Sequence, residues 1–472
     1  MVRPLTLLLF TLVLAGCPSR TRETIVAFPQ VATDLPELRR QGFMRALVDN
    51  NSVSYFIYKG RSMGFEYELL QNLADHLNLQ LKIKVISGVE ESINQLNTGG
   101  GDILAFPLTI TKERRKYVQF TQPLFQTSQV LVQRKAPNWR SDPEQAERAM
   151  IREPAELIGR EVYVMQGSAF ATRLRHLSEE IGGEIIIRED SAGAETEALI
   201  RRVADGEIDF TVTDQTLAMV NATYYNNLDV KTLVSLPQQI GWAVRNNAPE
   251  LQDALDSWLR KIRKSGYLKI IYDKYFNSPR TLAIRGTSDY SSISGGKLSP
   301  WDDEIKRGAS ELGWDWRLLG AIIYTESNFK PDATSWAGAQ GLMQLMPETA
   351  LQFGAADPLE PVQNIRAGVK FFQFLETQWA KTIADPDERI KFVLASYNVG
   401  ITHVIDARNL TRKYGRNPRI WEDHVAYYLL QKSQPRFYRD PVAAGGYCRC
   451  EGPVHYVREV LGRFEEYKIH LK

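Results

Sequence analysis

The periodicity of the apolar residues changes near residue 280, and this change constrains the fold more than any other feature of the chain. Between residues 40 and 277, short apolar runs such as 81–85 alternate with longer helical patterns. That alternation is typical of an α/β domain. Residues 278–299 are rich in Gly, Ser and Thr, which predicts a linker. Residues 300–472 have helical spacing almost throughout, so we expect an all-α domain there.

The start of the chain has the features of an export signal. An apolar run at 5–14 follows a basic residue and is too short to span a membrane. The next residues complete the sequence Leu-Ala-Gly-Cys, which resembles the bacterial lipobox. This resemblance implies a signal peptide over 1–16, acyl chains on Cys17 and a tether over 17–39. Because Pro18 rather than Asp follows the cysteine, it implies a periplasm-facing lipoprotein of the outer membrane, whereas plain secretion with an incidental cysteine is the alternative.

Charge and cysteine content bear on the partners and cofactors that the chain can have. The chain has 58 basic and 56 acidic residues and a net charge of +2, so we expect no nucleic-acid partner. Cys448 and Cys450 are separated by one residue, and a bond between them would close a very small ring. We therefore expect two thiols. His455 alone is weak support for a metal site, so we expect neither a metal nor another cofactor.

Glu326 is the most informative residue of the helical part. Leu319, Ile322 and Ile323 precede it at helical spacings, which places its carboxyl on an apolar face. The helix must end soon afterwards, because Pro331 cannot continue it. A half-buried carboxyl has a raised pKa, as a general acid needs near neutral pH. A glutamate satisfied by a neighbour or by a helix cap would give the same pattern.

Three motifs begin at this glutamate and follow it. They read Glu-Ser-Asn-Phe-Lys-Pro at 326–331, Gly-Leu-Met-Gln-Leu-Met-Pro at 341–347, after Ser335 and Gly338, and Ala-Ser-Tyr-Asn-Val-Gly at 395–400. In order and spacing they resemble the signature of goose-lysozyme-like soluble lytic transglycosylases. The resemblance covers about 298–472 and implies a lysozyme-like fold that acts on glycan strands of peptidoglycan.

The same resemblance implies the roles of six residues. Glu326 would be the catalytic acid and base, Ser335 and Gln344 would line the saccharide groove, Tyr397 would orient the acid, and Met346 and Asn398 would shape the floor. Two alternatives stay open: Met346 can belong to the core, and Asn398 can cap the helix ahead of Gly400.

The number of carboxylates bears on the chemistry. Glycosidases ordinarily place two carboxyls across the scissile bond, but this signature offers one. The resemblance implies a substitute, in which the N-acetyl group of MurNAc attacks C1 and the C6 hydroxyl then closes a 1,6-anhydro ring without water. A hydrolytic muramidase is the alternative, with Asp332 as a weak candidate for a second carboxylate. A non-catalytic lipoprotein that binds glycan and solute is a third interpretation.

The α/β part carries a second resemblance. It rests on Gly-Phe-Glu-Tyr-Glu-Leu-Leu at 64–70, Gly-Asp-Ile at 101–103, Thr-Ile-Thr-Lys-Glu-Arg at 109–114 and Phe-Thr-Gln-Pro at 120–123. These motifs are similar to those of family 3 bacterial solute-binding proteins, which implies two lobes, a hinge and a periplasmic location.

That resemblance also implies a ligand site. Arg114 would hold a ligand carboxylate, Asp214 its ammonium group, and Thr109 and Ser168 would add polar contacts. The implied ligand is an amino acid or the peptide end of a muropeptide. Arg114 as one of several solvated cations, and Ser168 as a helix cap, are the alternatives.

The order of lipid signal, solute-binding module and catalytic module resembles that of membrane-bound lytic transglycosylases, which implies that ligand binding tunes cleavage. The linker by itself would transmit little, so this tuning requires docked modules. We expect the docking surface between the second lobe and the helix predicted over 301–312.

Overall fold

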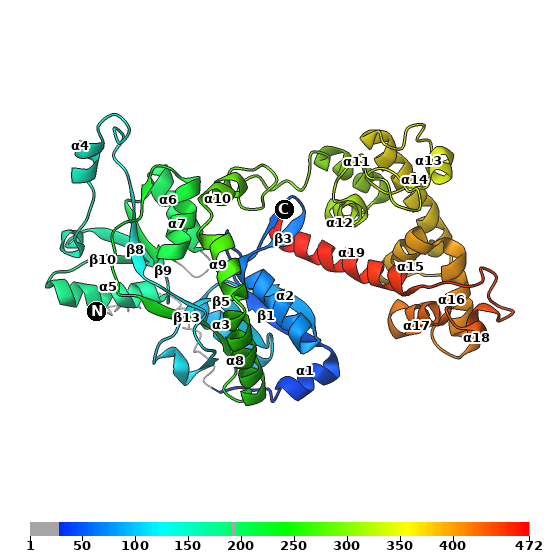
Figure 1. The fold of residues 1–472 in the computed structure, drawn as a ribbon, viewed down its shortest axis with the longest axis horizontal. Coiled ribbons are helices and arrows are strands. Elements are labelled where there is room, and N and C mark those ends of the chain that lie inside the picture. The colour runs from blue at the N-terminus through cyan, green and yellow to red at the C-terminus, as the bar shows by residue number, and fades with distance from the viewer. Residues whose placement is uncertain (1–27, 191–194, 472) are drawn as a thin grey trace, which may run out of the picture.

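The computed structural model describes residues 28–190 and 195–471 and consists of two modules (Figure 1). The first is a two-lobed α/β module and the second is helical, as the sequence predicts. Cys17, the leader and residues 17–27 of the tether lie outside the described residues. Among the described helices, none is both long and apolar enough to cross a membrane.

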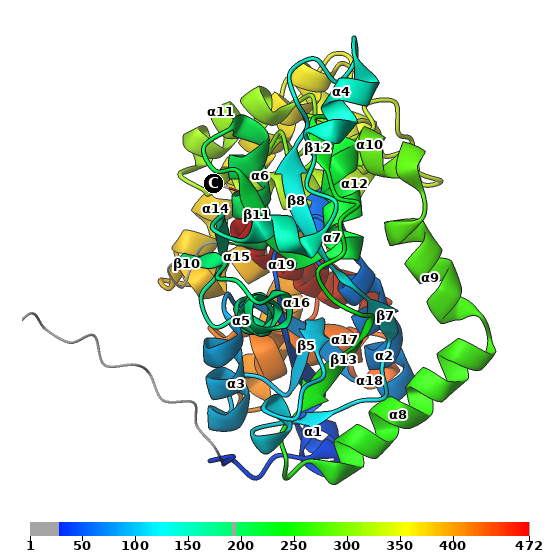
Figure 2. The same cartoon turned by 90° about the vertical axis from the view of Figure 1, so that its left-hand side faces the viewer.

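The first lobe is built on a mixed sheet of order β4-β1-β5-β13-β6, with β7 also paired to β13. β1 runs parallel to β4 and β5, whereas β13 is antiparallel to β5. The central strands are apolar along their length because helices or loops cover both faces. Figure 2 shows α8 and α9 following one another along an edge of this module. The elements of the lobe are α1 (Leu35–Gln41), β1 (Phe43–Val48), β2 (Phe56–Tyr58), β3 (Arg61–Met63), α2 (Phe65–Leu77), β4 (Gln80–Val85), α3 (Val89–Thr98), β5 (Ile103–Thr109), η1 (Arg114–Lys116), β6 (Gln119–Phe120), β7 (Phe125–Thr127), β13 (Gln238–Val244), α8 (Pro249–Lys264) and α9 (Tyr267–Phe276).

The second lobe is inserted between β7 and β13, so two strand connections join the lobes. Its sheet has the order β10-β9-β11-β8-β12. This double connection between two separate cores suits a hinge. The elements are β8 (Gln129–Arg134), α4 (Pro143–Arg148), η2 (Pro154–Leu157), β9 (Glu161–Met165), α5 (Ala169–Ile181), β10 (Ile186–Asp190), α6 (Thr196–Asp205), β11 (Phe210–Asp214), α7 (Gln215–Tyr224) and β12 (Leu228–Asp229).

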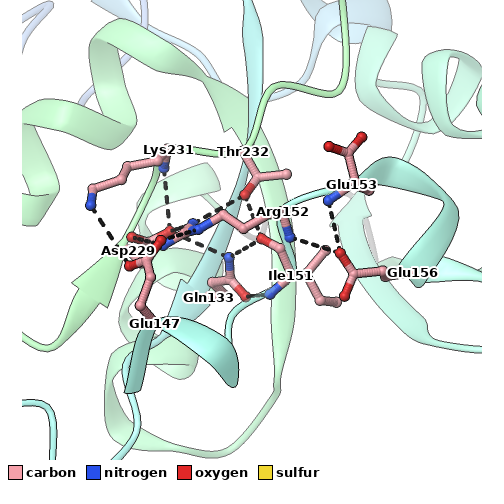
Figure 3. A network of polar contacts seen from close by, with 9 residues as sticks. All are labelled: Gln133, Glu147, Ile151, Arg152, Glu153, Glu156, Asp229, Lys231 and Thr232. Carbon is pink, nitrogen blue, oxygen red and sulfur yellow. Dashed lines mark hydrogen bonds and ion pairs between the residues drawn. The ribbon is translucent and has the colours of Figure 1, made fainter. Parts of the chain in front are cut away.

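A polar network holds the segment around α4 and η2 against the second lobe (Figure 3). The guanidinium of Arg152 donates to both carboxylate oxygens of Asp229, at 2.6 and 3.0 Å, and also pairs with Glu147 at 2.6 Å. Asp229 is nearly buried, so its pairing offsets the cost of removing a charge from water. Ile151 and Leu157 of the same segment are buried in the core of the second lobe, so polar and apolar contacts together hold the segment between β8 and β9 in place.

The helical module packs around α12, which is buried on most of its surface. α14 and α15 pack against each other, and α19 crosses both α12 and α15. The elements are α11 (Asp302–Leu312), α12 (Trp316–Ser327), α13 (Pro347–Gln352), α14 (Pro361–Ala380), α15 (Pro386–Val399), α16 (Ile401–Lys413), η3 (Trp421–Val425), α17 (Ala426–Gln431), α18 (Pro435–Tyr438) and α19 (Glu451–His470).

Cys448 and Cys450 form a disulfide in the loop that leads into α19, so the prediction of two free thiols is wrong. Their Cα atoms are 5.3 Å apart, within the ordinary range for a disulfide, because the backbone turns at this point to start the helix. Ring size judged from the sequence alone overlooked this turn.

The segment between the modules is structured rather than a free linker. α10 (Pro279–Gly286) packs against α7 and α9. Further on, the backbone N–H of Ser292 donates to the carbonyl of Ile57 at 2.9 Å, and the Ser292 hydroxyl accepts from the N–H of Ile57 at 2.9 Å. Ser292 therefore pairs with β2 through both its backbone and its side chain.

The modules dock through the C-terminal end of α19 and the β2–β3 hairpin of the first lobe. In Figure 1, α19 runs from the helical module to the first lobe and ends beside β3. Tyr467 donates to the carbonyl of Gly60 at 2.7 Å, Ser62 donates to Glu466 at 2.5 Å, and the rings of Tyr55 and His470 meet at 4.4 Å. The prediction that the second lobe docks on 301–312 is therefore wrong.

Close approach at this contact depends on Gly60. It has a left-handed φ of 76°, and a Cβ atom there would collide with the rings of Tyr324 and Phe329 of the helical module. Ile57 of β2 is buried within the core of the helical module. The two modules therefore share apolar packing, which the sequence pattern did not show.

Candidate functional site

Glu326 lies in the last turn of α12, as the sequence predicts. Asn328 ends the helix in a left-handed conformation, with φ of 51°, which a short polar side chain tolerates. Burial raises the pKa of Glu326 to about 7, a nearby Tyr456 hydroxyl lowers it, and the charge of Glu459 raises it. A carboxyl in this state is protonated at neutral pH often enough to act as a general acid.

Tyr456 of α19 is the residue of this site that the sequence analysis missed. Its ring is buried, and its hydroxyl lies close enough to the Glu326 carboxyl to lower the pKa of that carboxyl. Burial, and then the charge of Glu326, raise the pKa of Tyr456 well above its usual value, so it stays a donor. Nothing in its local pattern, in a helix far along the chain, marks it as part of the site.

Tyr397 does not hydrogen-bond Glu326 in this structure. Its hydroxyl donates to the carbonyl of Met343 at 2.5 Å, and its ring stacks on Phe372 at 4.3 Å. Burial, with a smaller effect of Glu326, raises the pKa of Tyr397. Tyr397 therefore lies near the acid but holds the loop that contains Met343.

That loop, residues 333–346, is fixed by its own polar side chains. Ser335 accepts from the N–H of Ala339 at 3.0 Å, and the side-chain nitrogen of Gln344 donates to the carbonyls of Ala333 and Gly341 at 3.0 and 2.9 Å. Gln344 has a backbone φ of 47°, a left-handed conformation that residues other than glycine rarely adopt. The loop imposes this conformation. Ser335 and Gln344 thus shape the loop beside the acid.

The remaining predicted groove residues lie at the surface. Met346 is 47% exposed and precedes α13, and Asn398 is exposed at the end of α15. Met346 is therefore not a core residue. Asp332, the weak candidate for a second carboxylate, is exposed in the turn after α12.

A second site lies between the two lobes of the α/β module. Arg114, Asp214, Thr109 and Ser168 all line one cavity there, whose space, including its open mouth, is about 970 Å³. The sequence analysis grouped these four residues although they lie on both lobes. The cavity lining combines cationic, acidic and hydroxyl groups with apolar side chains of both lobes.

The charged side chains of this cavity are only partly satisfied by other groups of the protein. Arg114 donates to the carbonyl of Thr109 at 3.0 Å, and one carboxylate oxygen of Asp214 is buried without a hydrogen-bond partner. Burial raises the pKa of Asp214 to about 7 and lowers that of Arg114 to about 10, and each charge opposes the shift of the other. Ser168 lines the cavity and also caps α5, since its hydroxyl accepts from the N–H of Ala171 at 3.4 Å.

Two acidic residues of the cavity were missed by the sequence analysis. Asp49 and Glu195 line it together with Asp214. Burial raises the pKa of Asp49 to about 6 and also raises that of Glu195. Asp49 follows the end of β1 and Glu195 precedes the start of α6, and no sequence motif includes either residue. Over the described ranges, 28–190 and 195–471, no group of three His, Cys, Asp or Glu side chains is arranged to hold a metal ion.

Comparison with known proteins finds relatives for both parts. Residues 44–278 match the family of bacterial extracellular solute-binding proteins, family 3, and residues 303–420 match the transglycosylase SLT domain. Proteins named membrane-bound lytic murein transglycosylase F match nearly the whole chain. The one from Desulfosudis oleivorans is 31% identical over 91% of this chain and 90% of its own, and the one from Pseudomonas fluorescens is 32% identical over 90% and 85%.

Solved structures are similar to the first module. A mutant of ArgBP from T. maritima is 25% identical, with a TM-score of 0.44, over 52% of this chain and 99% of its own. An ancestral arginine-binding protein bound to arginine is 22% identical, with a TM-score of 0.43, over 50% and 98%.

Proposed function

The chain belongs to the membrane-bound lytic murein transglycosylase F family, whose members act on peptidoglycan, and we propose that it cleaves the MurNAc-β-1,4-GlcNAc bond without water. The observation that carries the proposal is a half-buried Glu326 whose pKa is raised to about 7. One such group can give a proton and later take one back.

In the first step Glu326 donates its proton to the glycosidic oxygen while the N-acetyl carbonyl oxygen of MurNAc attacks C1, and the bond to the leaving sugar breaks. In the second step the Glu326 carboxylate takes the proton of the C6 hydroxyl of the same MurNAc. The C6 oxygen bonds to C1, the N-acetyl group leaves C1, and a 1,6-anhydro ring results. The hydroxyl of Tyr456 stabilises the carboxylate between the two steps.

Hydrolysis is the second candidate, because Glu459 lies close enough for its charge to raise the pKa of Glu326. The Glu459 carboxylate pairs with Arg463 at 3.2 Å and with His455 at 3.9 Å. These pairings favour an electrostatic role for Glu459 over a role as the second catalytic carboxylate. Mass spectrometry of the products from purified sacculi separates the two reactions, since an anhydro product is one water lighter. Products that carry the water would contradict the non-hydrolytic proposal.

We further propose that the cavity between the lobes binds an amino acid or a muropeptide end and that this binding tunes cleavage. Arg114 suits a carboxylate, and the buried, unpartnered oxygen of Asp214 suits an ammonium group. The docked α19 and β2–β3 hairpin give a physical route if ligand binding moves the hairpin, because Tyr467 and Ile57 join the first lobe to the helical module. Rates of the full chain with and without ligand test the coupling, and equal rates would refute it.

For location, we propose an outer-membrane lipoprotein anchored through acyl chains on Cys17, based on the lipobox-like sequence. Labelling with a radioactive fatty acid should mark the wild-type chain and not Cys17→Ala. Equal labelling of both would remove the anchor from this proposal.

A further inference from the structure

A second cleft lies where the two modules meet. It is bounded by the β2–β3 hairpin, by α10 and by the end of α12. Lys59 and Arg61 line it from the hairpin, Arg285 from α10, and Asn328 and Lys330 from the chain just after Glu326. The cleft is separate from the ligand cavity between the lobes, with which it shares no lining residue.

The charge of this cleft is one-sided. Four of its lining residues are cationic and none is Asp or Glu. In the part of the chain that the structure describes, none of the four makes an ion pair within 4.0 Å, although many other surface cations do. Lys59, Arg61 and Lys330 are exposed. Four unpaired cations that converge on one hollow attract an anion.

Arg285 shows that the site is built rather than an accident of surface charge. Its side chain is 2% exposed, and its Nη1 is buried without a hydrogen-bond partner. Nε and Nη2 donate to the carbonyls of Thr281 and Lys274, both at 3.3 Å, and the guanidinium lies 5.1 Å from the ring centre of Tyr275. A buried guanidinium without a counter-charge is costly, and an anion in the cleft would lower that cost through its charge.

The cleft lies within reach of the reaction. Lys330 follows Glu326 by four residues, so their Cα atoms are at most about 14 Å apart. A peptide of three to five residues spans about 10–18 Å when extended. Each MurNAc of the substrate carries such a peptide on its lactyl group, and that peptide has free carboxylates. A stem that branches from a glycan bound at Glu326 can therefore reach the cationic residues.

We propose that this cleft between the modules binds the carboxylates of the peptide stems of peptidoglycan, so that a solute-binding lobe contributes directly to substrate recognition. The inference rests on the cleavage activity proposed above. In this proposal the β2–β3 hairpin docks the helical module and also presents Lys59 and Arg61 to the substrate.

The test uses the full chain with the double substitution Lys59→Gln and Lys330→Gln. Both residues are exposed, so the fold should be unaffected. The matched control is Lys264→Gln with Lys381→Gln, which removes the same charge at two exposed positions that do not line the cleft. Each protein is assayed on soluble glycan strands that carry peptides and on strands from which an amidase has removed them.

We expect the cleft variant to raise KM on peptide-bearing strands by about tenfold, as loss of charge-assisted hydrogen bonds predicts. Its kcat on those strands, and both constants on peptide-free strands, should stay as in the wild type. An equal change on both substrates, an equal change in the control, or no change at all would overturn the inference. If wild-type protein cleaves neither substrate, the proposed activity fails instead, so the two failures are distinguishable.

Discussion

Replacing Glu326 by glutamine should abolish turnover and at the same time stabilise the protein at alkaline pH. An amide of the same shape cannot donate the proton, and general acid catalysis contributes about 10²–10⁴-fold in rate. Because Asp332 is exposed and Glu459 is paired with Arg463, we expect a loss at or beyond the upper end of that range. Glu311→Gln on α11, an exposed position, is the matched control and should leave the rate unchanged.

The stability effect follows from the pKa of the same carboxyl. Its pKa is about 7 in the folded protein against 4.5 in an unfolded chain, because burial disfavours the charged form. The protonated form is therefore favoured by folding, and its contribution to stability is present at low pH and is lost as pH rises to about 7. Above pH 7 the wild type is less stable than a neutral variant by up to about 3 kcal/mol.

Thermal or denaturant unfolding of wild type and Glu326→Gln at pH 4 and pH 8 measures this difference. The variants should match closely at pH 4, and the glutamine variant should be the more stable one at pH 8. The catalytic counterpart is a wild-type rate that falls as pH rises through about 7, as the acid loses its proton. Near wild-type release of products by Glu326→Gln, or a stability gain that does not grow with pH, would refute the reasoning.

Three further substitutions address Glu459, the cavity between the lobes and the contact between the modules. Glu459→Gln removes a charge that raises the pKa of Glu326, so the alkaline limit of the pH–rate profile should move to lower pH; loss of turnover at every pH would instead make Glu459 catalytic. Arg114→Ala should weaken binding of an amino acid or muropeptide by more than tenfold in calorimetry, and no heat with any such ligand on the wild type would rule out the sensor. Tyr467→Phe removes the hydrogen bond to Gly60 that joins the modules, so it should reduce a ligand effect on the rate, which is typically 5–150-fold for coupled sites; an unchanged ligand effect would show that this contact does not couple them.

The sequence predicted the parts of the protein whose information is local. The change from alternating to helical periodicity predicted the two fold classes. The two families that the motifs resemble, the solute-binding proteins and the transglycosylases, are confirmed by the matches at 44–278 and 303–420. Glu326 could be placed at the end of a buried helix because the apolar spacing before it and Pro331 after it are both within one turn or two. Thr109, Arg114, Ser168 and Asp214 were grouped by the resemblance to family 3 solute-binding proteins, and the structure places all four in the lining of one cavity.

The residues that were missed depend on tertiary packing. Tyr456 reaches Glu326 only because α19 crosses α12, and a helix crossing leaves no spacing rule in the sequence. Asp49 belongs to the ligand cavity only through the strand order of the first lobe. The Cys448–Cys450 bond depends on a local backbone turn, which residue separation does not reveal.

The position of the module interface bears on how ligand binding would act on catalysis, because the same helix contacts both modules. A single helix can couple two sites that it contacts, and α19 contacts two: Tyr456 lies beside Glu326, and Tyr467 bonds to the first lobe three turns further on. The helix at 301–312, where the sequence suggested a contact, packs against α12 and α14. Because α19 carries both contacts, movement of the β2–β3 hairpin on ligand binding would act on the helix that sets the environment of the acid. The proposed coupling is therefore assigned to the interface at the end of α19, where Tyr467 donates to the carbonyl of Gly60.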